Sequence, residues 1–103
     1  MEKRIGVIAV LVTDTASVKG INDTLHAYGH LVLGRQGLPL RDKGVNVISL
    51  IVEGDTDELG ALSGKLGRFP GAKVKSVLTP YQEAADGRTE RDGSEDALGS
   101  PRR

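Results

Sequence analysis

Two short groups of residues carry the side chains best suited to bind a small ligand. The first combines hydroxyl groups with a carboxylate after an apolar run, and the second places one guanidinium between glycines. The predicted ligand-binding residues are Thr13, Asp14, Thr15, Gly34, Arg35 and Gly37. A guanidinium with small neighbours can reach a carboxylate of a ligand or of a neighbouring subunit. The residues leave both options open, and a bent edge strand would explain the glycines without any ligand.

Metal binding and catalysis are less well supported by the residue types. His26 and His30 are four residues apart, the spacing that lets two imidazoles on one helical face bind a metal. Gly29 stands where a left-handed residue would end the helix between them, so we predict no metal site. Tyr28 is expected in the core. The chain has no cysteine, which excludes thiolate ligands and cysteine nucleophiles. We predict no catalytic residue and no enzyme, and the sequence names no cofactor.

The length and charge of the chain limit its partners. Its 103 residues fit one domain, and 14 basic residues balance 14 acidic ones. The long-range field that attracts nucleic acid or an anionic membrane is therefore absent overall. The apolar run near the N-terminus is too short to cross a bilayer, and no small-residue cleavage site follows it. We expect a cytoplasmic protein without direct contact to nucleic acid or membrane.

The ligand-binding groups depend on a regular alternation of strands and helices. β-branched and apolar runs predict strands, and apolar residues three and four positions apart predict helices. The predicted elements are a strand over 4–12, a helix over 18–28, a strand from His30, a turn over 41–44, a strand over 45–52, a helix from Asp55 to about Phe69 and a strand over 72–79. Asp55 and Glu58 resemble a capping box.

This order of elements predicts the fold class. A βαββαβ order is typical of the α+β ferredoxin-like two-layer sandwich, in which two helices cover one face of an antiparallel four-stranded sheet. We expect this domain to occupy residues 1–81. From Gln82 to Arg103 the chain has few apolar residues, so we predict a disordered tail there.

The strands at 4–12 and 45–52 are apolar on both faces. Successive side chains of a strand point to opposite faces, yet Ile5, Val7 and Leu11 alternate with Ile8 and Val10. The sheet face away from the helices therefore needs a cover, because an apolar face of this size usually marks an interface. We predict a homo-oligomer that assembles through this open face.

Several motifs of the chain resemble one family. The motifs are KRIGVIAVLV at 3–12, LHAYGHLVLGRQGLP at 25–39 and LSGKLGRFPGAKVK at 62–75. Together they are similar to iron-only hydrogenase system regulators. The resemblance implies an ACT-like domain, similar to the regulatory half of nickel-responsive repressors and oligomeric. Some members are labelled as ribbon-helix-helix transcription regulators, and we expect no such segment before residue 4 here.

The leading functional hypothesis is a regulatory domain of the iron-only hydrogenase system. It would act as a homo-oligomer that senses a small-molecule effector or interacts with a protein. If it regulates transcription, it would do so through a partner or as a sensor. One alternative is a small ferredoxin-like enzyme of the dimeric α+β barrel type. Another is a direct DNA-binding regulator, for which the folded part offers only scattered arginine and lysine residues.

Overall fold

The computed structural model describes residues 3–81, which contain four strands and two helices. Three short 3-10 helices, η1 to η3, join them. In chain order the elements are β1 (Lys3–Val12), η1 (Thr15–Ser17), α1 (Val18–Ala27), η2 (Gly29–Leu31), β2 (Val32–Leu40), η3 (Arg41–Lys43), β3 (Val45–Gly54), α2 (Thr56–Gly67) and β4 (Ala72–Tyr81). The predicted disordered tail at 82–103 lies outside the described residues and stays a prediction.

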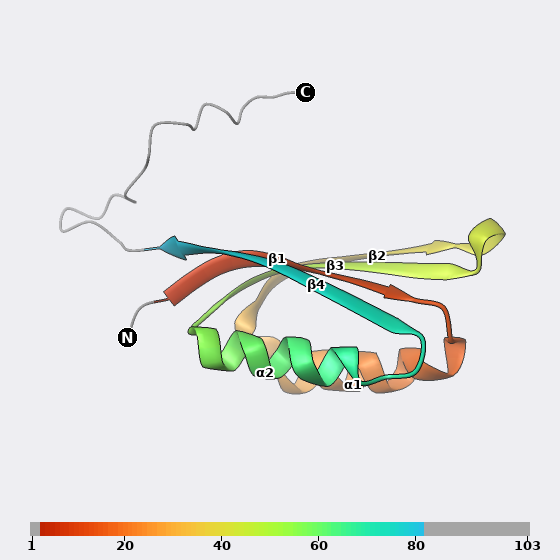
Figure 1. The fold of residues 1–103 in the computed structure, drawn as a ribbon, viewed down its shortest axis with the longest axis horizontal. Helices are drawn as coiled ribbons and strands as arrows, with labels where there is room; N and C mark the ends of the chain where they lie inside the picture. Colours follow the sequence, from red (N-terminus) through yellow and green to blue (C-terminus); the bar gives the residue numbers. More distant parts are fainter. Residues whose placement is uncertain (1–2, 82–103) are drawn as a thin grey trace, which may run out of the picture.

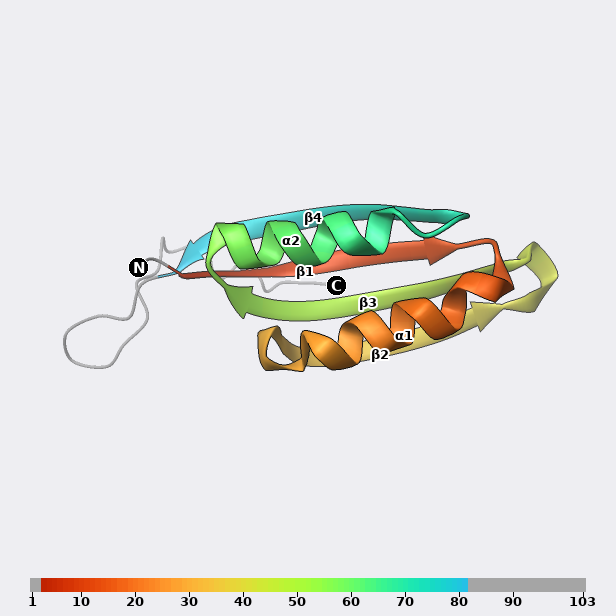
Figure 2. The same cartoon turned by 90° about the horizontal axis from the view of Figure 1, so that it is seen from below.

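The four strands form one antiparallel sheet in the order β2-β3-β1-β4. Both helices lie on the same face of this sheet, and no helix or strand of residues 3–81 covers the other face (Figure 1). Seen from below, α2 lies over β4 and β1, and α1 lies over β3 and β2 (Figure 2). This confirms the predicted ferredoxin-like two-layer sandwich.

The core lies between the sheet and the helix layer. One alternating set of strand residues is fully or almost fully buried against the helices, and three leucines of α2 close the core from the other side. The buried apolar residues are Ile8, Val10, Val12, Ile21, Leu25, Leu31, Ile48, Leu50, Val52, Leu59, Leu62 and Leu66. The helical spacing of the leucines in α2 therefore marks its buried side, as predicted.

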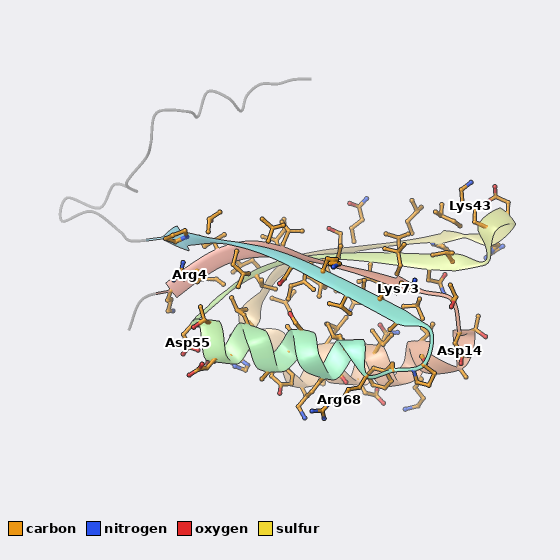
Figure 3. All side chains as sticks on the ribbon, in the orientation of Figure 1. Arg4, Asp14, Lys43, Asp55, Arg68 and Lys73 are labelled. Atoms are coloured by element: carbon orange, nitrogen blue, oxygen red, sulfur yellow. The ribbon has the colours of Figure 1, made fainter. Side chains whose placement is uncertain are left out.

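Aspartate side chains begin both helical segments, at opposite ends of the helix layer (Figure 3). The Glu58 N–H donates to Asp55 Oδ1 at 2.8 Å, and the Asp55 N–H donates to Glu58 Oε1 at 3.2 Å. This reciprocal pair is the predicted capping box of α2. Asp14 caps η1, because its Oδ1 accepts the Ala16 N–H at 2.9 Å.

The end of α1 differs from the prediction. Gly29 was expected to end the helix in a left-handed conformation, but the positive-φ glycines of the described chain are Gly44 and Gly71. α1 stops at Ala27, and Gly29 begins η2, whose turn is closed by the N–H of Val32 on the Gly29 carbonyl. Consecutive 3-10 hydrogen bonds replace the left-handed cap, so His30 belongs to η2 and β2 begins at Val32.

Candidate functional site

Four of the six predicted ligand-binding residues line two separate grooves. A groove of about 580 Å³ lies between α1 and β2, and we call it the α1–β2 groove. Its lining residues are Asn22, Leu25, His26, Gly29, Val32, Leu33, Gly34 and Arg35. A second groove of about 470 Å³, the hairpin groove, lies near the turn between β2 and β3. Its lining residues are Thr13, Thr15, Pro39, Leu40, Arg41, Gly44, Val45 and Asn46.

Asp14 and Gly37 line neither groove, and Thr13, which lines the hairpin groove, already has a structural partner. The backbone N–H and the hydroxyl of Thr13 both donate to the Gly71 carbonyl, at 3.0 and 3.3 Å. The Asp14 carboxylate caps η1 and does not line the groove. Gly37 lines neither groove. Thr15 is exposed and lines the hairpin groove. The polar groups expected to converge on an effector thus partly serve the fold.

Arg35 faces the helix layer because β2 contains a bulge. Val32 pairs with Val52 of β3, whereas Gly34 pairs with Ile51 and Arg35 with Leu50, so Leu33 is the extra residue. A bulge of one residue reverses which side chains point to each face. Without it, Arg35 would point to the open face. β2 is an edge strand, as the bent-edge explanation of its glycines required, and its bulge lies at Leu33, just before Gly34.

The guanidinium of Arg35 is held by α1. Its Nη2 donates to Asn22 Oδ1 at 3.0 Å. Among residues 3–81 the ion pairs are Lys19–Asp23 and Lys43–Asp42, so no described carboxylate pairs with Arg35. Asp23 is hydrogen-bonded to Lys19 at 2.8 Å, which raises the pKa of the exposed Lys19 ammonium. The groove therefore presents a positive charge that lacks a described acidic partner.

Asn22 and His26 were not predicted as groove residues. They lie one turn apart on α1, and both line the α1–β2 groove with Arg35. The sequence contains one usable signal, because positions four apart lie on the same side of a helix. The spacing of Asn22 and His26 does not predict that Arg35 lies opposite them. That position depends on the bulge in β2.

The two histidines of the chain lie in different surroundings. His26 lines the α1–β2 groove, whereas the His30 ring stacks on Tyr28 with ring centroids 6.4 Å apart. No three histidine, cysteine, aspartate or glutamate side chains of the described segment gather closely enough to hold a metal ion. In the same segment, no helix is long and apolar enough to span a membrane.

The open face of the sheet carries exposed apolar side chains from all four strands. By register, Val7 lies between Ile51 and Val77, and Leu11 lies beside Val47. The large apolar residues with exposed fractions from 43% to 68% are Val7, Leu11, Leu33, Leu38, Ile51 and Val77. All of them belong to this face except Leu33, which lies in the bulge at its edge. Both faces of β1 and β3 are therefore apolar, as predicted.

The open face also carries polar residues. Lys75, Ala9, Ser49 and Gln36 form one row across the strands, because each pairs with the next, and all but Ala9 are polar. In another row, Glu53 and Thr79 pair with Ile5 from its two sides. Lys73 and Lys75 lie along β4, which is an edge strand, so this edge of the open face is basic.

Comparisons with known proteins identify similar chains. Residues 4–76 match the TM1266-like family, described as "Iron-only hydrogenase system regulator, putative". The solved structure of TM1266 from Thermotoga maritima is 36% identical, with a TM-score of 0.71, and the match covers 75% of this chain and 98% of that one. No curated protein matches the chain.

A second solved structure shows the fold alone. It is a protein from Galdieria sulphuraria that is 18% identical, with a TM-score of 0.53, and the match covers 76% of this chain and 46% of that one. At this level of identity the similarity extends to the arrangement of strands and helices and carries no statement about function.

Proposed function

Since the chain belongs to the family of iron-only hydrogenase system regulators, we propose that it is a homo-oligomeric regulatory domain that senses a small-molecule effector. We place it in the cytoplasm, where it would control the hydrogenase system. Any effect on transcription would pass through a partner, because the balanced charge of 14 basic and 14 acidic residues offers no strong attraction for DNA.

The open face is the observation that carries this proposal. Five large apolar side chains on four adjacent strands are exposed to solvent there. Burying such a surface stabilises association by about 25 cal/mol for each Å² of apolar area removed from water, before the entropy of association is subtracted. If the open face of a second subunit covers the open face of the first, the two subunits form a closed dimer with two-fold symmetry. The lysines of β4 would form part of its polar rim.

Ligand sensing is supported by the two grooves. The α1–β2 groove borders α1, the hairpin groove borders η1, and each combines an arginine with other polar groups. The α1–β2 groove lies on the helix side, whereas the proposed subunit contact uses the opposite face. An effector could thus reach a groove while the subunits remain assembled.

Light scattering coupled to size-exclusion chromatography tests the assembly. The native chain should elute as an oligomer at micromolar concentration, and Ile51→Lys should elute as a monomer, because a buried lysine without a partner strongly disfavours the contact. Ala61→Lys is the matched control, since Ala61 is exposed on α2 in the helix layer. It adds the same charge and should leave the oligomer intact.

Two outcomes would contradict the assembly. A native chain that is monomeric at micromolar concentration would leave the open face without its proposed cover. A folded Ile51→Lys variant that keeps the native oligomer size would place the subunit contact elsewhere. Native mass spectrometry of gently purified protein would also detect a retained effector by its mass.

A further inference from the structure

We propose that the α1–β2 groove binds a small organic carboxylate, with its carboxylate on Arg35 and its apolar body on Leu25, Val32 and Leu33. The inference rests on the ligand-sensing part of the proposed function and adds the chemical class of the ligand and its site. Binding to the groove can be measured independently of assembly. Three properties of the groove support the inference: its charge, its rigid polar end and its apolar wall.

The charge of the groove favours an anion. Arg35 supplies a guanidinium, and no aspartate or glutamate of residues 3–81 lines the groove. A guanidinium has five N–H donors in a planar fork. In the described chain, the Arg35 guanidinium donates one hydrogen bond to a neutral amide oxygen, Asn22 Oδ1. The remaining donors match the two oxygens of a carboxylate, which arginine commonly binds through two parallel hydrogen bonds.

Asn22 and His26 make the polar end of the groove a defined site. The hydrogen bond of 3.0 Å from Arg35 to Asn22 joins β2 to α1 and fixes the guanidinium at the groove. With its oxygen occupied, the Asn22 side chain still has an NH₂ group that can donate. His26 lies one turn further along α1 and lines the same groove. A carboxylate on Arg35 would therefore have further hydrogen-bond donors from the helix nearby.

The negative end of the α1 dipole does not outweigh these donors. Carbonyl groups at a helix C-terminus repel an anion most strongly when they lack partners. Here the carbonyls of Thr24 and His26 both accept the Tyr28 N–H. The Arg35 guanidinium carries a full positive charge, which exceeds the negative charge of about half a unit at a helix C-terminus.

The apolar wall distinguishes an organic acid from a simple inorganic anion. Leu25 is buried, Val32 is half-buried, and Leu33 is 59% exposed in the bulge. A β-carbon added to Gly29 would meet no heavy atom of the described chain within 4 Å, and Gly29 has no positive φ. The missing side chain at Gly29 thus leaves room beside the apolar residues. An alkyl or aryl group would cover Leu33 and gain burial.

A titration followed by backbone amide NMR shifts tests the inference on the full chain. The probes are sodium acetate, hexanoate and benzoate, with hexanamide and benzamide as neutral counterparts. Hexanoate and benzoate should bind more tightly than acetate, with the largest shifts at residues that line the α1–β2 groove. Arg35→Gln should weaken hexanoate binding at least about tenfold, because a hydrogen bond to a charged group contributes about 1.5–3 kcal/mol.

Arg41→Gln is the matched control. Arg41 is an exposed arginine that lines the hairpin groove, so its loss removes the same charge and should leave hexanoate affinity unchanged. Dispersed amide shifts will show that each variant is folded. If Arg35→Gln does not fold, Asn22→Ala, which removes the partner of the guanidinium, serves as the second variant and should weaken binding several-fold.

Several results would overturn the inference. These are no saturable shift with any of the three carboxylates, equal affinity for hexanamide and hexanoate, and shifts that centre on the hairpin groove. Light scattering on the same samples separates this inference from the assembly proposal. An oligomer that ignores all carboxylates refutes the carboxylate site and leaves assembly standing, whereas a monomer that binds hexanoate at Arg35 supports the site and refutes assembly.

Discussion

At the scale of single residues, Gly71 joins the two halves of the βαββαβ chain. Its carbonyl accepts two hydrogen bonds from Thr13, and the neighbouring Pro70 carbonyl accepts the Ser17 hydroxyl at 2.7 Å. The turn before β4 is therefore tied to the junction between β1 and α1. This gives Thr13 and Ser17 a structural role that their sequence positions do not reveal.

Replacing Gly71 with alanine should destabilise the fold more than the same change at Gly44. Both glycines have positive φ, 76° and 66°, which disfavours a side chain by about 1–2 kcal/mol. A β-carbon at Gly71 would also lie 2.8 Å from the Asp14 N atom, whereas one at Gly44 meets nothing within 4 Å. We expect the free energy of unfolding to fall by more than about 2 kcal/mol for Gly71→Ala and by about 1 kcal/mol for Gly44→Ala.

Urea denaturation of both variants checks this pair. Equal losses of stability would show that the contact with Asp14 relaxes freely and that φ alone decides the effect. A larger loss at Gly44 would contradict the geometry of both turns.

At the scale of elements, α2 is defined by its ends as well as by its buried leucines. The capping box satisfies two backbone N–H groups at its start, those of Asp55 and Glu58, which have no partner within the helix. This signal lies in a few neighbouring residues, so it could be read from the sequence. The end of α1 could not, because the 3-10 turn at Gly29 depends on where Leu31 enters the core.

Asp55→Ala should lower the free energy of unfolding by about 1 kcal/mol, because it removes the cap of α2. Asp57→Ala is the control, since Asp57 lies in the same first turn and is exposed but takes no part in the capping box. Asp57→Ala removes only the interaction of this carboxylate with the helix dipole, so the free energy of unfolding should fall by about 0.3 kcal/mol. Thermal or urea unfolding measures both values, and equal effects would mean that charge rather than the cap hydrogen bonds stabilises this end.

At the scale of the whole molecule, each central strand serves two layers. Leu50 and Ile51 are neighbours on β3, yet Leu50 is 0% exposed against the helices and Ile51 is 49% exposed on the open face. The first contributes to the fold of one subunit. The second, in our proposal, contributes to the contact between subunits.

This difference predicts how stability depends on protein concentration. Leu50→Ala should lower the free energy of unfolding by about 2–5 kcal/mol at every concentration. Ile51→Ala should lower it little in dilute protein and more in concentrated protein, because only the assembled form loses the contact. Chemical denaturation over a hundredfold range of concentration distinguishes the two. A concentration-independent loss for Ile51→Ala would contradict assembly through this face.

The sequence by itself determined the order of elements, the buried face of each and the apolar character of both sheet faces. These properties follow from local periodicity, from caps such as Asp55 with Glu58, and from turn residues such as Gly44, each of which acts within a few residues. Motifs spread over the chain also indicated the family that the comparisons then showed.

Only the tertiary structure decided which candidate residues meet. A one-residue bulge at Leu33 turns Arg35 toward Asn22 on α1, and the turn at Gly71 engages Thr13. Strand register depends on pairing between distant segments, and a shift of one residue exchanges the two faces. The sequence therefore named Arg35 as a candidate, but the fold placed it in the α1–β2 groove and separated it from Thr13 and Thr15.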